Sequence, residues 1–456
     1  ESARHALLDT PSRQARRLLQ ANGMGVISMN LTRALGSVGG LTLVSRVLAL
    51  VRDTLQASFV GASFASDAFF VAFRLPNMFR ALFAEGAFSA AFIPLFNKKV
   101  AEGGGGDAGL AAGADFAERA LALLFPVLVV FTSAMLVAAY PITWALSGGF
   151  ERQHPSPEQF AFAVTLSRLT IPYLLLISLV SLLGGILNSL HRFWVNAAAP
   201  ILLNATLIAA LLFFHDDLPL MTARNQAIAV TVSGALQLLW LWYACRRAGV
   251  TLRLKLPRLG PDVKRLMALI GPAAAGAGAV QINLVVSTAL AARLLPSGSV
   301  SYIDAADRLN QLPLGLIGIG LGTVLLPTIS RLLGRGEDAA AMTTQNRGME
   351  LALLLTLPAT VALVVCGAPI AAALFQHGKF DATDTHFTAQ ALAAFSIGLP
   401  SYILVKVLTP GYYARSDTKT PVRYATISMG VNLALNLVLI VPLQHMGPPL
   451  ATAIWD

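Results

Sequence analysis

Charged side chains lie inside two stretches of this chain that are otherwise apolar. In residues 45–96 they are Arg46, Arg52, Asp53, Asp67, Arg74, Arg80 and Glu85. In residues 301–330 they are Asp304, Asp307 and Arg308. On insertion scales an arginine or aspartate at the centre of a bilayer costs about 2.5–3.5 kcal/mol. We therefore expect these groups to face a wet cavity or one another rather than lipid.

The spacing of these charges predicts shared helix faces. Arg46 and Asp53 are seven residues apart, nearly two helical turns, and so are Asp67 and Arg74. Asp304 and Arg308 are four apart, which brings them together on one face. The carboxylates could balance the arginines formally, but several stand near expected span ends, where water solvates them. The pattern therefore predicts an arginine-lined cavity with positive potential.

The ligand that such a cavity favours is a phosphate or diphosphate. The planar guanidinium group binds phosphate oxygens through two parallel hydrogen bonds. The alternative is that the arginines extend toward helix ends or form structural ion pairs. This alternative applies most to Arg52 and Arg80, which stand near expected span ends or kinks.

Membrane-spanning helices are the elements that must position these residues. The chain has 456 residues, of which 55% are hydrophobic and 12% charged, whereas soluble domains have about 25% charged residues. A span needs about 20 mostly apolar residues. The chain has blocks of this kind and the start of one more, at 37–60, 66–96, 118–146, 163–189, 196–214, 225–245, 266–295, 301–330, 349–375, 387–413, 422–443 and 447–456. The fold class that we predict is an all-α integral membrane protein.

Topology accounts for most of the net charge of +10. With the N-terminus in the cytoplasm, most loop lysines and arginines fall on the cytoplasmic side, and only Arg152, Arg224, Arg293 and Lys379 fall opposite. This is the asymmetry of membrane proteins, so we expect no nucleic-acid partner. The most basic loop, 246–265, is either a topology signal alone or also contacts anionic lipid headgroups.

Catalytic and metal-binding patterns are not evident in the sequence. Cys245 and Cys366 are expected near opposite membrane faces, and the histidines are scattered. The loops are short and present no acidic pair, so we expect no enzyme, cofactor or metal site. Residues 1–28 are arginine-rich and are expected to form a cytoplasmic extension. The chain stops at Trp455-Asp456 within an apolar run, so we expect a fragment whose C-terminal helices are missing.

An internal repeat divides the predicted spans into two halves. Arg74-Leu75 matches Arg308-Leu309, Pro126 matches Pro358, and Pro172 matches Pro400. The alternative is that proline and glycine are simply common in membrane helices. We expect two pseudo-symmetric six-helix bundles around a central cavity. The first comprises residues 29–247, a basic linker covers 248–265, and the second comprises 266–456 with spans seven to eleven and part of span twelve.

Several sequence runs resemble one known family. The runs are SRVLALVRD, DAFFVAFRLPNMFRALFAEGAFSAAFIPLF, GSVSYIDAADRLNQLPLGLIGIGLGTVLLPTIS, LFQHGKFDATDT and VLTPGYYARSDTKTPV. From about Met29 to its end, the chain is similar to the MurJ (MviN) family of bacterial lipid II flippases in the MOP transporter superfamily, which also contains MATE transporters.

The resemblance implies fourteen helices, of which the last two, forming a groove for the lipid tail, would be absent from this chain. It implies that lipid II, a polyprenyl diphosphate, moves from the inner to the outer leaflet of the bacterial cytoplasmic membrane by alternating access. It implies functional roles for charged positions, and we add Arg74 where a basic residue is usual. The predicted substrate-binding residues are Arg46, Arg52, Asp67, Arg74, Arg80, Glu85, Asp307 and Arg308.

Some family members hold sodium with an acidic residue on span seven. Residues 271–292 contain no acidic residue, so we expect transport to be coupled to the membrane potential rather than to sodium. We expect the transporting unit to be a monomer. The nearest alternative is another MOP flippase, for O-antigen or another polysaccharide lipid. A cation-coupled drug exporter would more often have acids and aromatics in its cavity.

Overall fold

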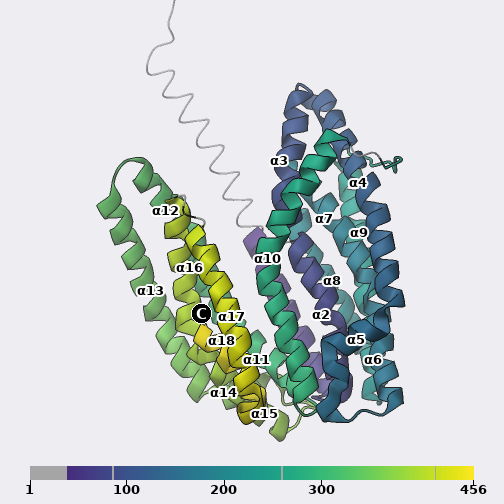
Figure 1. Ribbon diagram of the computed structural model, residues 1–456, viewed down its shortest axis with the longest axis vertical. Coiled ribbons are helices and arrows are strands. Elements are labelled where there is room, and N and C mark those ends of the chain that lie inside the picture. The colour runs from purple at the N-terminus through teal and green to yellow at the C-terminus, as the bar shows by residue number, and fades with distance from the viewer. Residues whose placement is uncertain (1–37, 85–86, 258–259, 416, 418, 456) are drawn as a thin grey trace, which may run out of the picture.

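The computed structural model describes residues 38–84, 87–257, 260–415, 417 and 419–455, and every regular element within these ranges is helical (Figure 1). The predicted extension 1–28 and Glu85 lie outside the described residues. The first helix spans residues 38–60. The others are α2 (Phe64–Ala84), α3 (Ala87–Glu102), α4 (Gly106–Val137), α5 (Ala139–Ser147), η1 (Gly148–Gln153), α6 (Pro157–Thr170), α7 (Pro172–Ser189), α8 (Phe193–Phe213), α9 (Pro219–Arg247), α10 (Pro261–Leu294), α11 (Ser299–Pro313), η2 (Leu314–Ile319), α12 (Gly320–Gly334), α13 (Asp338–Val365), α14 (Gly367–Phe375), α15 (Ala382–Ile397), α16 (Leu399–Ala414), α17 (Lys419–Leu443), η3 (Gln444–Met446) and α18 (Gly447–Trp455).

The helices form two groups that approach each other at one end and diverge at the other (Figure 1). One hydrophobic core is built mainly from α2 to α9 and the other from α11 to α16. Two helices cross this division. Ala57 of the first helix is buried in the second core, and Ala291 and Ala292 of α10 are buried in the first. The first helix thus packs into the second group, and α10 packs into the first group, so that these two helices join the groups.

Helix order repeats between the two groups, and prolines mark the same places. Pro126 lies inside α4 and Pro358 inside α13, and each of these helices is followed by a nine-residue helix, α5 or α14. Pro172 begins α7 directly after α6, and Pro400 begins α16 directly after α15. Proline has no backbone N–H and favours a break or kink. The predicted correspondence of these prolines is confirmed in the helix order.

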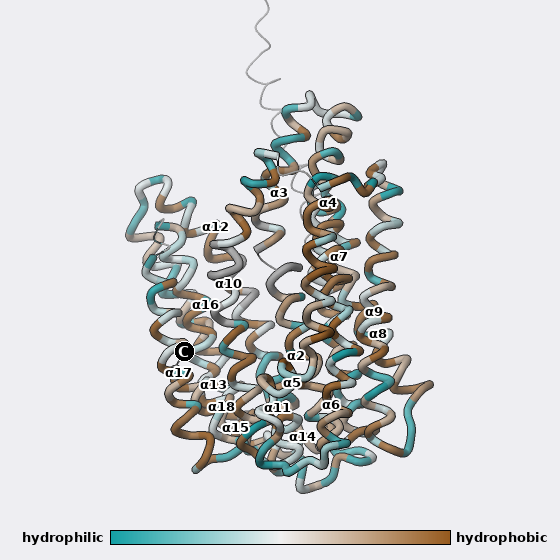
Figure 2. The backbone as a smooth tube through the Cα atoms, turned by 45° about the vertical axis from the view of Figure 1, so that its right-hand side comes forward, coloured by the Kyte–Doolittle hydropathy of each residue, from teal (hydrophilic) through white to brown (hydrophobic). Residues whose placement is uncertain are grey.

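Among the residues that the structure describes, seven helical segments are long and apolar enough to cross a membrane on length and composition alone. They correspond to the predicted spans three to six and nine to eleven, the last continuing through α18. Hydrophobic residues occupy most of their length, and hydrophilic residues gather at the turns (Figure 2). The four predicted spans outside this set are the first helix, α2–α3, α10 and α11–α12. Three of the four carry the buried charges, and these helices lie where the two groups meet.

One carboxylate ties the two groups at the end where they approach. Asp67 of α2 is fully buried, and its oxygens accept hydrogen bonds from the backbone N–H of Gly298 (2.8 Å) and of Ser301 (3.0 Å). The Ser301 hydroxyl (2.7 Å) and the Gln153 side-chain amide (3.2 Å) also donate to it. The first N–H groups of a helix have no partner within the helix. Asp67 supplies that partner to α11 from the other group.

Backbone contacts close the same end, which we call the closed end. The Lys379 N–H donates to the Ser58 carbonyl (2.9 Å), and Gly378 turns there with φ of +60°. A β-carbon on Gly378 would lie 2.3 Å from the Ser58 oxygen, so only glycine fits without movement. An exposed ion pair, Arg293 to Glu151 (2.9 Å), adds a weaker contact.

Asp67→Ala is expected to lower the free energy of unfolding by at least about 2 kcal/mol, because each buried N–H that loses its acceptor costs about 1–3 kcal/mol. The matched control is Glu151→Ala, which removes an exposed ion pair at the same end and should cost less than about 1 kcal/mol. Thermal and denaturant unfolding of the detergent-solubilised protein measure both. Equal destabilisation by the two variants would contradict the assigned role of Asp67.

Candidate functional site

A buried carboxylate joins the first helix to α11. One oxygen of Asp53 accepts from Arg52 Nη2 (2.6 Å) and Nε (2.9 Å). The other oxygen lies 3.0 Å from Nε of Arg308, which also lies 3.7 Å from Asp304. The side chain of Asp53 is only 9% exposed. The predicted meeting of Asp304 and Arg308 is confirmed, and Asp53 is shared between two arginines from different helices.

Arg52 is also fixed from a third helix. Its Nη1 donates to Oδ1 of Asn204 in α8 (3.0 Å), and the Asn204 amide donates to the Ser45 carbonyl (3.0 Å). Sequence reasoning missed Asn204. The only available signal was a buried-type polar residue within the apolar block 196–214. Arg52 is therefore oriented by two partners before any ligand arrives.

Arg46 packs against backbone instead of a carboxylate. Its guanidinium group lies beside Gly315 of η2, where an added β-carbon would come 2.4 Å from Nη1. The segment η2 is a π-helix. This conformation is rare in proteins overall, but where it occurs it is often at a functional site. Arg46 and Asp53 thus both point toward the α11–η2 segment, as their spacing predicts. In the described ranges no ion pair involves Arg46.

Arg74 of α2 reaches the same region from the other group. Its Nη2 donates to the Leu284 carbonyl of α10 (3.3 Å). The Arg74 guanidinium also interacts electrostatically with Asp304, Asp307 and Arg308 of α11. Asp307 is half-buried and accepts from the Gln311 amide on its own helix. Arg74 and Arg308, which occupy matching places in the repeat, therefore lie near each other with two carboxylates between the groups.

The remaining predicted residues lie elsewhere. Arg80 Nε donates to Asn77 Oδ1 on the same helix (3.0 Å). Asp67 lies at the closed end, where its donors are Gly298, Ser301 and Gln153 rather than an arginine. The structure thus brings together Arg46, Arg52, Arg74, Asp307 and Arg308, and it places Asp67 apart from them.

The charge balance differs from the sequence-based expectation. Carboxylates were expected to lie near span ends in water, but Asp53 is 9% exposed and Asp304 18% exposed, and both pair with Arg308. Desolvation of an unpaired charge costs several kcal/mol, which explains this pairing. Arg46 and Arg74 form no ion pair with a carboxylate among the described residues. Lys406 of α16, which sequence reasoning missed, lies beside Gly318 of the same η2 segment.

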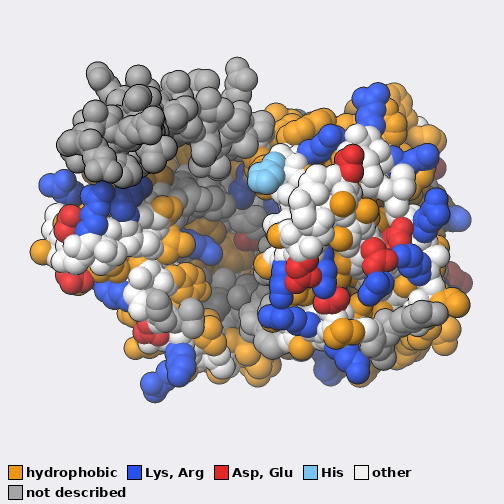
Figure 3. Space-filling view, turned by 90° about the horizontal axis from the view of Figure 1, so that it is seen from above, with side chains coloured by type: hydrophobic (Ala, Val, Ile, Leu, Met, Phe, Trp, Pro, Cys, Tyr) orange, Lys and Arg blue, Asp and Glu red, His pale blue; other side chains and the backbone are white. Residues whose placement is uncertain are grey.

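The two groups diverge at the end opposite the closed end, and we call it the open end (Figure 1). Seen from this end, the surface is hollowed between the two groups, with lysine and arginine side chains around it (Figure 3). Beyond Asp53, toward the closed end, the space narrows to a cavity of about 20 Å³ between Gln56, Ser66 and Ser301. Such a volume holds about one water molecule. The described side chains therefore leave little space between Asp53 and the closed end.

Metal ligation has no support in the described part of the chain, where no group of three or more His, Cys, Asp or Glu side chains could hold an ion. The chemistry that the arrangement offers is the binding of an anion by guanidinium groups.

Comparisons of this chain with protein families, with curated proteins and with solved structures all find similar proteins of one family. A family model described as "Lipid II flippase MurJ" matches residues 56–455. A Rhizobium tropici protein named "Probable lipid II flippase MurJ" is 42% identical over 430 residues, which cover 93% of this chain and 79% of that protein.

Two solved structures have a similar fold. One is described as "Lipid II flippase MurJ, inward closed conformation", with a TM-score of 0.77, 25% identity and coverage of 92% of this chain and 84% of its own. The other is an inward-facing MATE family transporter of the MOP superfamily, with a TM-score of 0.72, 14% identity and coverage of 90% and 91%. The predicted MATE-like fold class is confirmed.

Gly315→Ala is expected to weaken binding of inorganic diphosphate by about tenfold or more, because the new methyl group displaces the Arg46 guanidinium and small misplacements in a binding site are costly. The matched control is Gly318→Ala, where the nearest atom to the new methyl group, on Lys406, is 3.5 Å away. Isothermal titration calorimetry of both purified variants measures the effect. Equal affinities for diphosphate would show that Arg46 does not depend on Gly315.

Proposed function

The chain belongs to the MurJ lipid II flippase family, and from this premise we propose that its arginines at the first helix, α2 and α11 bind the diphosphate of lipid II. Its function is that of the family, lipid II flipping, and it is a multi-pass membrane transporter. The observation that carries the proposal for the site is Arg46, a cation with no ion pair among the described residues, beside the Asp53 pairs that join both groups of helices.

The ligating set that we propose is Arg46, Arg52, Arg74 and Arg308. Asp307 takes a second role, since it lies close enough to act on the charge of Arg74 and can compete with a phosphate for the same cations. A transporter must release what it binds, and a nearby carboxylate lowers the cost of release. Arg80 of α2 is proposed as a further contact, and so is Glu85, which lies outside the described residues. Asp67 is proposed to act on conformation, through α11, rather than on the phosphate.

Direction follows from the loop charges. The open end carries the basic turns with Arg246, Arg247 and Lys255, whereas the closed end carries few cations. Cytoplasmic loops are the ones enriched in lysine and arginine. We therefore assign the open end and the N-terminus to the cytoplasm of a bacterial inner membrane. The substrate enters from the inner leaflet and leaves toward the outer one.

The transport cycle that we propose is alternating access between two halves, residues 29–247 and 266–456, joined by the basic linker 248–265. The diphosphate binds at the arginines, the sugar-peptide head occupies the hollow, and the polyprenyl chain stays in apolar surroundings. Rupture of the Asp67 contacts with α11 then opens the closed end. No covalent step is needed, the membrane potential acts on the charged substrate, and a monomer is sufficient.

Arg46→Ala and Arg308→Ala are each expected to reduce lipid II flipping in proteoliposomes by about a hundredfold, because each removes charge-assisted hydrogen bonds to the diphosphate. The matched control is Arg293→Ala, an exposed arginine at the closed end, which should flip at the parental rate. Reconstituted amounts of each variant are compared by quantitative blotting.

Flipping by Arg46→Ala at the rate of the Arg293→Ala control would overturn the proposed site. In the same assay Asp307→Lys should bind lipid II more tightly and flip it more slowly. An unchanged flipping rate in Asp307→Lys would exclude the release role of this carboxylate.

A further inference from the structure

Gln56 of the first helix has a buried side-chain amide that the transport cycle described above does not use. The residue is 5% exposed, and neither its Nε2 nor its Oε1 has a hydrogen-bond partner among the described residues. Buried polar groups are nearly always hydrogen-bonded, and one without a partner indicates a bound water, a bound ion or a functional role. The amide of Gln56 therefore indicates a ligand in the space beside it.

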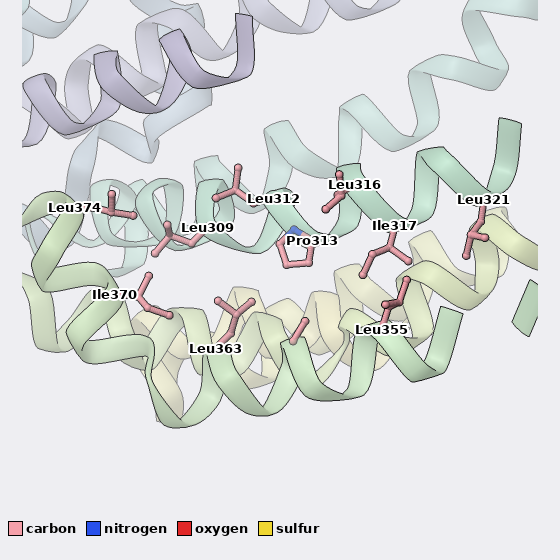
Figure 4. Close-up of a pocket in the computed structure, with 11 residues that line it drawn as sticks. Leu309, Leu312, Pro313, Leu316, Ile317, Leu321, Leu355, Leu363, Ile370 and Leu374 are labelled. Carbon is pink, nitrogen blue, oxygen red and sulfur yellow. The ribbon is translucent and has the colours of Figure 1, made fainter. Parts of the chain in front are cut away.

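That space is a small polar cavity where three helices meet. Its volume is about 20 Å³, and its polar lining consists of Asp53 and Gln56 of the first helix, Ser66 of α2, and Ser301 and Asp304 of α11. A second pocket, of about 730 Å³ between α11–η2–α12 and α13–α14, is lined by aliphatic side chains alone (Figure 4). Of these two cavities, only the small one has side chains that form hydrogen bonds.

Asp53 supplies an acceptor to this cavity. Asp53 and Gln56 are three residues apart, which places them on one side of the helix. Oδ1 of Asp53 accepts both hydrogen bonds from Arg52, whereas Oδ2 accepts none among the described side chains. Nε of Arg308 lies 3.0 Å from Oδ2 but donates no hydrogen bond, so this contact is an ion pair only. Oδ2 therefore retains lone pairs for another donor.

One water molecule is the ligand that fits these groups. The volume is that of about one water, and a buried water needs two to four polar partners. Oδ2 of Asp53 and Oε1 of Gln56 can accept from it, and Nε2 of Gln56 can donate to it. A metal cation fits less well, because it cannot accept from Nε2. Asp53 and Asp304, the two carboxylates of the wall, also pair already with Arg308.

We propose that Gln56, together with one bound water, stabilises Asp53 when the diphosphate of the substrate takes Arg308 away from it. The proposal rests on the proposed diphosphate site and adds to it a positioning residue. Removing one partner of a buried ion pair leaves an uncompensated charge, which is costly. Hydrogen bonds to an ionised carboxylate are strong and reduce that cost. Gln56 thus acts through Asp53 and does not contact the phosphate.

The cavity also adjoins the contacts that hold the closed end. Ser301 lines the cavity, and its backbone N–H and hydroxyl both donate to Asp67. The exchange of partners at Asp53 therefore takes place beside the hydrogen bonds that must break when the closed end opens. Gln56 lies between the two events in space.

The test replaces the amide by apolar side chains of similar size, in Gln56→Leu and Gln56→Met. The matched control is Gln237→Leu in α9. Gln237 is 2% exposed and its Nε2 also lacks a partner among the described residues, but it does not line the cavity. Isothermal titration calorimetry measures binding of inorganic diphosphate to each purified variant, alone and combined with Asp53→Asn. Thermal unfolding without diphosphate measures stability.

We expect Gln56→Leu and Gln56→Met to bind inorganic diphosphate about tenfold more weakly than the parental protein, which corresponds to the loss of one hydrogen bond to a charged group. Gln237→Leu should bind it with parental affinity. The unfolding midpoint of the Gln56 variants should not fall, because an amide without protein partners is replaced by an apolar group. In the Asp53→Asn background, where no charge has to be compensated, the Gln56 substitutions should change the affinity less than about twofold.

Parental affinity in both Gln56 variants would overturn the proposal and leave the diphosphate site intact. A tenfold loss that persists in the Asp53→Asn background would also overturn it, because Gln56 would then act independently of Asp53. So would an unfolding midpoint of both Gln56 variants below that of Gln237→Leu, since Gln56 would then support the fold. A parental affinity that depends on sodium at constant ionic strength would replace the water by a cation and contradict the proposal. Failure of the parental protein to bind inorganic diphosphate would instead remove the proposed site itself.

Discussion

A charge inside a membrane span must be paired or hydrated, and this requirement determines how the first helix, α2 and α11 lie. Asp53 meets it by accepting hydrogen bonds from Arg52 and forming an ion pair with Arg308 at once. The ion pair joins two helices that both contribute to the second core, and Arg52 links it through Asn204 to α8 of the first core. Breaking one partner of a buried pair costs several kcal/mol, so the first helix and α11 are held in register. The positions of Arg46 at η2 and Arg74 at α10 follow from this register.

The same requirement links the binding site to the conformation. An incoming diphosphate brings negative charge that competes with Asp53, Asp304 and Asp307 for the arginines. At the closed end, Asp67 holds the start of α11 through three hydrogen bonds, from the backbone N–H of Gly298 and from the backbone N–H and hydroxyl of Ser301. One helix thus carries Arg308 in its middle and the Asp67 contact at its start. A ligand that binds at the proposed site and shifts α11 would act on both contacts at once, which gives a physical route from substrate capture to opening.

The sequence was sufficient for the fold class and for the repeat of the helices. Long apolar blocks predicted the helices, and the matched prolines predicted their repeat. Four-residue spacing predicted the contact of Asp304 with Arg308. Spacing within a helix is a local property, however, and it cannot show what a side chain meets on another helix. For this reason the sharing of Asp53, the capping of α11 by Asp67 and the support of Arg52 by Asn204 emerged only from the structure. The balance of charge between the arginines Arg52, Arg74 and Arg308 and the nearby carboxylates could not be predicted from the sequence either. It depends on the burial of Asp53 and Asp304, which is decided by packing between helices.

The central claim is that this protein carries lipid II across the membrane at its arginine site. The most direct measurement is the amount of lipid II in the outer leaflet of cells depleted of the endogenous flippase and supplied with either the parental protein or Arg46→Ala. The account predicts that lipid II reaches the outer leaflet with the parental protein and accumulates in the inner leaflet with Arg46→Ala at equal protein abundance. Equal amounts of outer-leaflet lipid II in the two strains, with no other flippase present, would contradict it.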